Sequence, residues 1–237
     1  MDTFVDSSWY FLRYVDPKNS KQFTSKEKIK SSLPVDMYVG GAEHSVLHLL
    51  YSRFFVKALK NLGYLNFDEP FSALRHQGII LGSDGQKMSK SRENVVDPDE
   101  LVKVYGADAV RIYLCFMGEY SQGGPWNPKG ILGVKRFLDR IWSYYNKNDK
   151  TWAGKHNADF QRLLHQTIKK VGEDIDNFRF NTAVSSLMIM FNALEKENIS
   201  KDTAKIFLKI LSPIAPHFTE ELWSLIGNKK SIHLEVW

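Results

Sequence analysis

Apolar residues in the second half of the chain recur every three or four positions, the spacing that places them on one face of a helix. Three such stripes run through residues 180–194, 204–211 and 218–226. Before them, residues 121–130 (SQGGPWNPKG) hold three glycines and two prolines, a composition typical of a domain boundary. The pattern predicts an all-α helical bundle over residues 129–237.

The first half of the chain alternates short apolar runs with turns. Residues 35–39 and 77–81 predict strands, and residues 43–60 between them predict a helix. Residues 97–100 (DPDE) begin a further helix, with aspartate as the cap and proline at the first helical position. The order strand, glycine turn, helix, strand predicts an α/β nucleotide-binding fold over residues 1–128.

Two polar runs in this half predict irregular structure. Residues 16–34 are rich in lysine and serine and predict a surface loop. Residues 82–85 (GSDG) have the composition of a tight turn.

The composition is that of an ordinary globular protein. Of 237 residues, 43% are hydrophobic and 25% are charged, which leaves room for two domains. No apolar run is long enough to cross a bilayer, so we expect no membrane partner. Cys115 is the single cysteine, which excludes an internal disulfide and predicts a cytoplasmic protein. The net charge of +5 is compatible with a nucleic acid partner, but a lysine-rich composition alone would also explain it.

Two lysines and two serines gather in residues 87–91, KMSKS. Ammonium groups on a mobile turn can follow the charge that builds on a departing pyrophosphate. A generic run of this kind would be a solvated basic turn. This pentapeptide, however, is similar to the second signature motif of the class I aminoacyl-tRNA synthetases, and it stands between a predicted strand and a capped helix, as in that family.

The flanking sequences narrow the resemblance to leucyl-tRNA synthetases. The segments that carry it are residues 4–10 (FVDSSWY), 38–44 (YVGGAEH), 47–54 (LHLLYSRF), 105–109 (YGADA) and 216–223 (PHFTEELW). The resemblance implies a partial Rossmann-like catalytic domain followed by an anticodon-binding-type bundle. It also implies leucine–tRNA ligase activity, with L-leucine, ATP and tRNA(Leu) as partners and Mg²⁺ accompanying ATP.

The resemblance assigns roles to individual residues on the nucleotide side. Lys87 and Lys90 match the catalytic lysines, and Ser89 lies between them. Gly41 and Glu43 match the element that holds the ATP ribose, where a carboxylate can accept from two hydroxyls. The positions that match residues near the adenine are Gln77, Ile80 and Met88.

For the amino acid, the resemblance implies an apolar pocket. Phe4, Ser7 and Tyr10 match its wall, and their spacing of three suits one helical face. Ordinary core packing would explain the same spacing. His44 and His48 match residues that close the pocket; a metal site is not expected because no third ligand accompanies the pair.

Several family features lie outside the 237 residues. The chain has no His-x-Gly-His signature. No segment of it resembles the editing domain or the small C-terminal domain of leucyl-tRNA synthetases. We therefore expect the isolated chain to need a separate N-terminal half, whether the chain is a split subunit, a truncated reading frame or a fragment. Glu93 stands where the family usually has glycine, which favours a rival reading as a non-catalytic tRNA-binding remnant or assembly subunit. A synthetase for isoleucine or valine is disfavoured, because those enzymes usually carry aspartate and glutamine where this chain has Glu43 and His44.

The same reasoning predicts an exposed apolar patch near the start of the chain. Phe4, Trp9, Tyr10 and Phe11 would face the missing half of the fold and remain uncovered.

Overall fold

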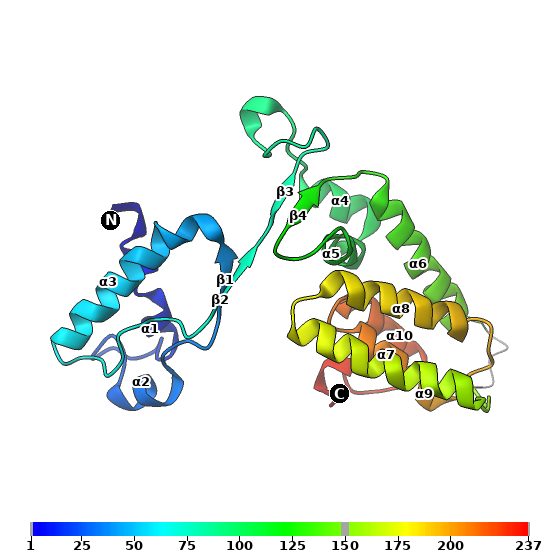
Figure 1. The fold of residues 1–237 in the computed structure, drawn as a ribbon. Helices are drawn as coiled ribbons and strands as arrows, with labels where there is room; N and C mark the ends of the chain where they lie inside the picture. Colours follow the sequence, from blue (N-terminus) through cyan, green and yellow to red (C-terminus); the bar gives the residue numbers. More distant parts are fainter. Residues whose placement is uncertain (1, 148–151, 237) are drawn as a thin grey trace. The chain divides into compact units, whose positions relative to one another are not determined.

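The computed structural model describes residues 2–147 and 152–236. The chain forms two compact units, one ending at Gly78 and the other beginning at Ile79 (Figure 1). This division differs from the predicted domain boundary at residues 128 and 129, which stays a prediction about the two sequence domains. Among the described residues, no helix is both long and apolar enough to cross a membrane.

The first unit is a small βαβ arrangement. Its strands β1 (Tyr38–Gly41) and β2 (Leu74–Gln77) are parallel, with Tyr38 opposite Leu74 and Gly41 opposite Gln77. Helix α3 (His48–Asn61) connects them. The N-terminal segment adds 3-10 helices at Asp2–Phe4 and Asp6–Ser8 and the short helix α1 (Tyr10–Tyr14).

The core of this unit lies among α1, α3 and helix α2 (Lys26–Ser32). Its buried members are Phe11, Leu12, Ile29, Leu33, Val56 and Leu65. The prediction of an uncovered patch is therefore wrong for Phe11, which is 4% exposed, and Trp9 and Tyr10 pack against the same core. The sequence pattern did not predict which residues cover Phe11, because they lie 18 or more positions away in the chain.

Three predicted elements of this unit need correction. The loop predicted over residues 16–34 contains α2, whose N-cap Ser25 accepts from the backbone N–H of Lys28. The helix predicted from residue 43 begins at His48 instead, because Leu47 has a non-helical backbone (φ −111°, ψ −107°) and a 3-10 helix at Ala42–Ser45 precedes it. The strand predicted at residues 35–39 is shifted towards Gly41.

The second unit begins with a parallel strand pair. Strand β3 (Ile79–Leu81) pairs with β4 (Gly123–Pro125), which the sequence pattern did not predict. The single strand predicted over residues 77–81 is thus two strands in two sheets, separated at Gly78. Between β3 and β4 lie helices α4 (Pro98–Tyr105) and α5 (Ala107–Phe116). The predicted cap of α4 is confirmed, since the Asp97 side chain accepts from the backbone N–H of Asp99.

The predicted helical bundle is confirmed by five helices in the described part of the second unit. They are α6 (Gly130–Tyr145), α7 (Ala158–Asp176), α8 (Phe180–Leu194), α9 (Lys201–Leu211) and α10 (Pro216–Leu225). Helices α7 and α8 lie side by side, and α5 packs against both α6 and α8 (Figure 1). One continuous apolar core therefore runs from α5 through the bundle.

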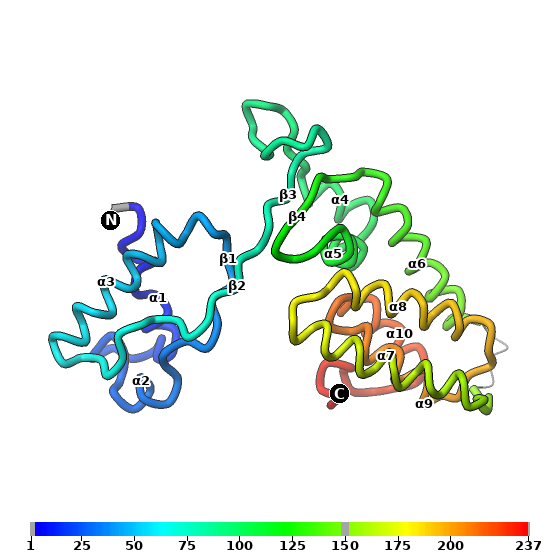
Figure 2. Tube along the Cα trace, in the orientation of Figure 1, coloured from blue at the N-terminus to red at the C-terminus, as the bar shows by residue number. Residues whose placement is uncertain are grey.

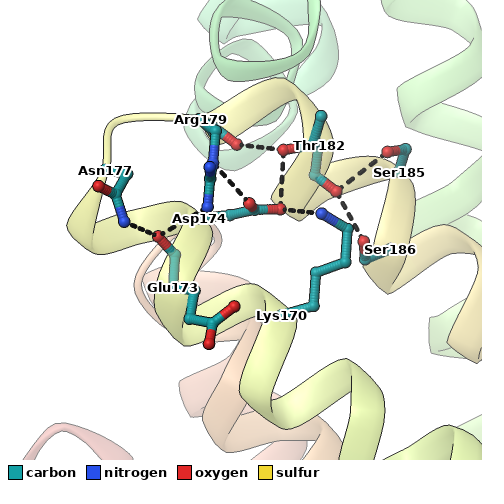
Figure 3. A network of polar contacts seen from close by, with 8 residues as sticks. All are labelled: Lys170, Glu173, Asp174, Asn177, Arg179, Thr182, Ser185 and Ser186. Carbon is teal, nitrogen blue, oxygen red and sulfur yellow. Dashed lines mark hydrogen bonds and ion pairs between the residues drawn. The ribbon is translucent and has the colours of Figure 1, made fainter.

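A buried carboxylate joins α7 to α8. Asp174 is 1% exposed and accepts from Lys170 (2.8 Å), the Arg179 Nε (2.9 Å) and the Thr182 hydroxyl (2.7 Å) (Figure 3). The two cations and the hydroxyl compensate for the loss of water around the charge. This network fixes the turn at Phe178, which has a left-handed backbone (φ 59°).

Candidate functional site

The KMSKS pentapeptide lies on an exposed loop that leaves β3 and returns to α4 (Figure 2). Leu81 and Lys87 form an antiparallel bridge at its base, and the Gly82 N–H donates to the Gln86 carbonyl (2.8 Å). Lys90–Arg92 then form one turn of 3-10 helix. The loop is thus a short hairpin followed by a tight helical turn, and the pentapeptide spans the junction.

The two lysines of the pentapeptide point their charges to solvent. Lys87 and Lys90 are both exposed, and among the described residues no carboxylate forms an ion pair with either. Met88 between them packs against the apolar core, as does Ile80 of β3. The loop is therefore anchored by its apolar residue and presents two ammonium groups that can meet an anion.

Glu93 ends the 3-10 turn in the left-handed conformation, with φ 54° and ψ 23°. A residue with a Cβ pays a steric cost in this region that glycine avoids. This backbone explains why glycine suits the position. Glutamate bears the steric cost that glycine would avoid.

In the first unit, Gly41, Glu43 and Gln77 lie together at the ends of the parallel strands. Gly41 is buried and is opposite Gln77 in the strand register. The exposed Glu43 carboxylate folds back over Gly41, where an added Cβ would collide with it. The carboxyl end of a parallel sheet is where ligands approach α/β folds, and the side-chain-free backbone here permits a close approach.

Phe4, Ser7 and Tyr10 do not share one helical face, because they lie in three separate short helices. Phe4 stacks on Tyr51 of α3 (ring centroids 5.8 Å apart), and the Ser7 hydroxyl donates to the Phe4 carbonyl (3.1 Å). Tyr10 lies 6.0 Å from the His48 ring. Three successive short helices, instead of one, thus place Phe4 and Tyr10 against residues of α3.

His44 lies in the 3-10 helix that precedes α3, and His48 is the first residue of α3, among aromatic rings. Their ring centroids are 6.0 Å apart, and His48 is also 5.4 Å from Tyr38 and 6.4 Å from Phe71. Burial, and secondarily the nearby His44, lower the pKa of His48, so its ring is neutral at pH 7. The buried His44 Nδ1 has no hydrogen-bond partner. In the part of the chain that the structure describes, no three His, Cys, Asp or Glu side chains gather as metal ligands.

Four further residues lie beside the histidines or in the signature loop and were not identified from the sequence. Tyr38 and Phe71 (ring centroids 4.8 Å apart) support the histidines, and Asp84 and Asn94 hydrogen-bond across the signature loop. Asn94 could have been found, since it follows the pentapeptide closely in the sequence. The aromatic pair depends on parallel strand pairing, which brings together residues 33 positions apart.

Comparison with known proteins gives a consistent picture. The model of the class I tRNA synthetases (I, L, M and V) matches residues 1–126, and the model of the anticodon-binding domain of tRNA ligases matches residues 158–237. The chain is 49% identical to a leucine–tRNA ligase of Caldanaerobacter subterraneus and 50% identical to one of Clostridium beijerinckii, with all of this chain covered. It spans 31% of the length of each of these relatives.

Solved structures share the fold. A LeuRS of Agrobacterium radiobacter K84, in a ternary complex with tRNA and LeuAMS, superposes with a TM-score of 0.88 at 37% identity, over 99% of this chain and 33% of that one. A methionyl-tRNA synthetase of Mycobacterium tuberculosis, bound by methionyl-adenylate, matches with a TM-score of 0.68 at 19% identity over 95% of this chain and 50% of that one, which indicates the fold alone. Since the family model covers more than half of the chain, and the fold and signature loop agree with it, this chain belongs to the class I tRNA synthetases (I, L, M and V).

Proposed function

We propose that this chain is part of a leucine–tRNA ligase, contributing the signature-loop portion of the activation site and a tRNA-binding bundle. The observation that carries the proposal is the KMSKS loop itself, with its two solvent-facing lysines, in a chain 46–50% identical to leucine–tRNA ligases over its full length. The relatives are about three times as long, so the remainder of the activity would come from residues outside these 237.

The proposed reaction has two steps. A carboxylate oxygen of L-leucine attacks the α-phosphorus of ATP, the bond to the bridging α–β oxygen breaks, and leucyl-adenylate and pyrophosphate form. A hydroxyl of the terminal adenosine of tRNA(Leu) then attacks the leucyl carbonyl carbon, and AMP leaves. Because the protein forms no bond in either step, its contribution is positioning and charge stabilisation.

Lys87 and Lys90 would stabilise the negative charge that grows on pyrophosphate as it departs. Both are exposed and unpaired with carboxylates among the described residues, which leaves their ammonium groups available. Ser89 would contribute its hydroxyl, which lies 3.2 Å from that of Ser91. A loop whose Met88 packs against the core could close over the triphosphate after ATP binds.

The adenosine would be bound at the strand ends. Glu43 would accept hydrogen bonds from the two ribose hydroxyls, and Gly41 would let the backbone approach the nucleoside. Gln77 is opposite Gly41 in the strand register, which supports its assignment beside the adenine.

Leucine would be held against the N-terminal aromatic residues. Phe4, Ser7 and Tyr10 would line the side-chain pocket, with His44 and His48 closing it. A neutral His48 suits this role, because a charged imidazolium would disfavour an apolar side chain.

Magnesium would arrive with ATP. Among the described residues, no three His, Cys, Asp or Glu side chains gather as metal ligands. Bound to the triphosphate, Mg²⁺ would supply charge neutralisation, and the lysines would act on the charge that remains.

The bundle would bind the phosphate backbone of tRNA. The match to the anticodon-binding domain supports this role, as do Arg136, Arg140 and Lys147, which line a surface pocket on α6. Asp139 and Glu195 line the same pocket, so the positive charge there is moderate. We place the reaction in the cytoplasm, in line with the single cysteine.

Leucine-dependent ATP–pyrophosphate exchange tests the proposal. We expect no exchange from the chain alone. Once an N-terminal half of a leucyl-tRNA synthetase that carries His-x-Gly-His is added, we expect exchange that is selective for leucine over isoleucine, valine and methionine. Failure of every such combination, with tRNA binding retained, would instead favour the non-catalytic tRNA-binding remnant. Selectivity for another amino acid would overturn the assignment to leucine.

A further inference from the structure

Two side chains outside the KMSKS pentapeptide close the signature loop on itself. The Asn94 amide nitrogen lies 3.2 and 3.1 Å from the two carboxylate oxygens of Asp84, and it also donates to the Lys87 carbonyl (3.4 Å). The Asn94 side-chain oxygen accepts from the backbone N–H of Ser89 (2.9 Å). We call Asp84 and Asn94 together the loop clamp.

The loop clamp contacts both halves of the loop. Asp84 belongs to the turn before the pentapeptide, where its carboxylate also accepts from the backbone N–H of Gln86 (3.0 Å). That bond and the bond from Asn94 lower the pKa of Asp84, so the carboxylate is charged throughout the neutral range. Asn94 follows the pentapeptide and uses the donor and the acceptor of its amide group together.

The backbone around the clamp is shaped to fit it. A Cβ added at Gly82 would stand 2.6 Å from the Asp84 carboxylate and 2.8 Å from the Asn94 amide nitrogen, so a larger residue would separate the pair. Glu93 immediately before Asn94 adopts the left-handed conformation that reverses the chain there. The absence of a side chain at Gly82 and the left-handed turn at Glu93 therefore both favour the contact between Asp84 and Asn94.

Over residues 2–147 and 152–236, the ammonium groups of Lys87 and Lys90 form no ion pair. Lys87 is tethered through its backbone carbonyl, and Lys90 begins the turn that Asn94 follows. The position of both ammonium groups thus depends on the backbone between Asp84 and Asn94.

We propose that the loop clamp of Asp84 and Asn94 positions Lys87 and Lys90 for the pyrophosphate of ATP. The role of the clamp in catalysis rests on the proposed function. The contact between Asp84 and Asn94 does not depend on it. In this proposal both residues act through the backbone of the loop, so both are positioning residues. Asp84 is exposed and Asn94 is half-buried, so the hydrogen bonds between them are weak in net terms, and this lets the loop open and close rather than locking it.

The clamp is first tested on this chain alone by limited trypsin digestion, since trypsin cuts after Lys87, Lys90 and Arg92. Asn94→Asp places two carboxylates together and should accelerate cleavage at these sites about tenfold, on the order of one broken charge-assisted contact. Cleavage after Lys18 and Lys21, in the other compact unit, serves as the internal reference. Equal cleavage of the loop in wild type and Asn94→Asp would overturn the clamp.

The exchanged pair separates the contact from a general effect of substitution. Asp84→Asn combined with Asn94→Asp restores one amide and one carboxylate, so cleavage should return to within about threefold of wild type. Glu119→Gln, at an exposed loop carboxylate that accepts from Ser121, is the matched control and should change nothing. Loop cleavage in the exchanged pair as fast as in Asn94→Asp would count against the contact.

The positioning role is tested in the complete leucine-activating enzyme. Asn94→Asp should lower kcat for ATP–pyrophosphate exchange about tenfold or more with the leucine KM nearly unchanged, and the exchanged pair should recover most of it. An unchanged kcat in a variant whose loop is cleaved faster would overturn the positioning role. If wild type itself shows no leucine-dependent exchange, the proposed function fails, while the digestion result still reports on the clamp.

Discussion

The Asp108 carboxylate accepts a hydrogen bond from the backbone N–H of Phe218, with 2.6 Å between Oδ2 and N. Phe218 lies in the first turn of α10, whose own N-cap residue, Ala215, offers no side-chain cap. The other Asp108 oxygen pairs with Arg111 (2.8 Å). A residue of α5 thus caps a bundle helix 110 positions later, and joins the signature-loop region to the bundle within one compact unit.

Asp108→Ala should lower the free energy of unfolding by about 2 kcal/mol, since it removes both a cap and the ion pair of a buried carboxylate with a half-exposed arginine. Urea unfolding of the chain measures the change through the midpoint. Asp159→Ala is the matched control, because Asp159 also lies in a first helical turn beside an arginine three residues on, but is 87% exposed and lacks a tertiary partner. Equal losses in both variants would contradict the long-range cap.

Asp174→Asn should lower the free energy of unfolding by about 3 kcal/mol at pH 7, near the lower end for breaking a buried pair, because Lys170 and Arg179 are half exposed (Figure 3). Burial raises the pKa of Asp174, but Lys170, Thr182 and Arg179 together lower it below its ordinary 3.8. A depressed carboxylate pKa stabilises the fold above pH 3.8 and ceases to do so as pH falls through the folded-state value.

The penalty of Asp174→Asn should therefore shrink at pH 3 relative to pH 7. Chemical unfolding at the two pH values checks this. Glu173→Gln is the control, since that carboxylate is 56% exposed and lies 3.8 Å from its lysine. A penalty independent of pH would indicate that packing, not charge, explains the loss.

Glu93→Gly should stabilise the signature loop by about 1 kcal/mol, the steric cost of a left-handed residue less the added freedom of glycine. It should also raise exchange activity in the complete enzyme, because a carboxylate leaves the turn that we propose to bind the phosphates. Glu93→Ala removes the charge but keeps the Cβ, so it separates the two effects: activity should rise without the gain in stability. Lower activity in Glu93→Gly would show that the glutamate has been adopted for function.

Lys90→Ala, in the complete enzyme, should reduce kcat for leucine activation far more than it changes the leucine KM. By analogy with removing one preorganised donor, the loss should be about 2–4 kcal/mol of transition-state stabilisation. Steady-state exchange kinetics measure it. Lys103→Ala is the control, because that lysine lies on α4 and pairs with Glu100 (2.7 Å). Similar kinetics in the two variants would reduce the loop to a solvated basic turn.

The chain should bind tRNA with an affinity that falls steeply as salt rises and with little preference for leucine tRNA. Each phosphate contact releases counterions, so Arg136→Ala should reduce the slope of log K against log salt by about 1. Titrations at low and moderate salt test this. Arg162→Ala, whose arginine pairs with Asp159, should leave the slope unchanged. Tight binding that is insensitive to salt would reveal specific recognition instead.

Local information in the sequence determined the bundle helices and the start of α4. The stripes over α8, α9 and α10 repeat at helical spacing, and Asp97 caps its own helix two residues away. KMSKS was recognisable because the motif is contiguous. Such features depend on neighbours within a few positions, which the sequence lists directly.

Non-local pairing decided the rest. Residues 77–81 form two strands because β2 pairs with β1 and β3 pairs with β4, and both partners lie more than 30 positions away in the chain. Leu47 interrupts a run that is apolar at helical spacing, so periodicity alone could not place the start of α3. The contacts from Asp84 to Asn94 and from Asp108 to Phe218 join residues whose types are unremarkable in themselves; only folding brings donor and acceptor together, since a hydrogen bond depends on distance and direction rather than on sequence separation.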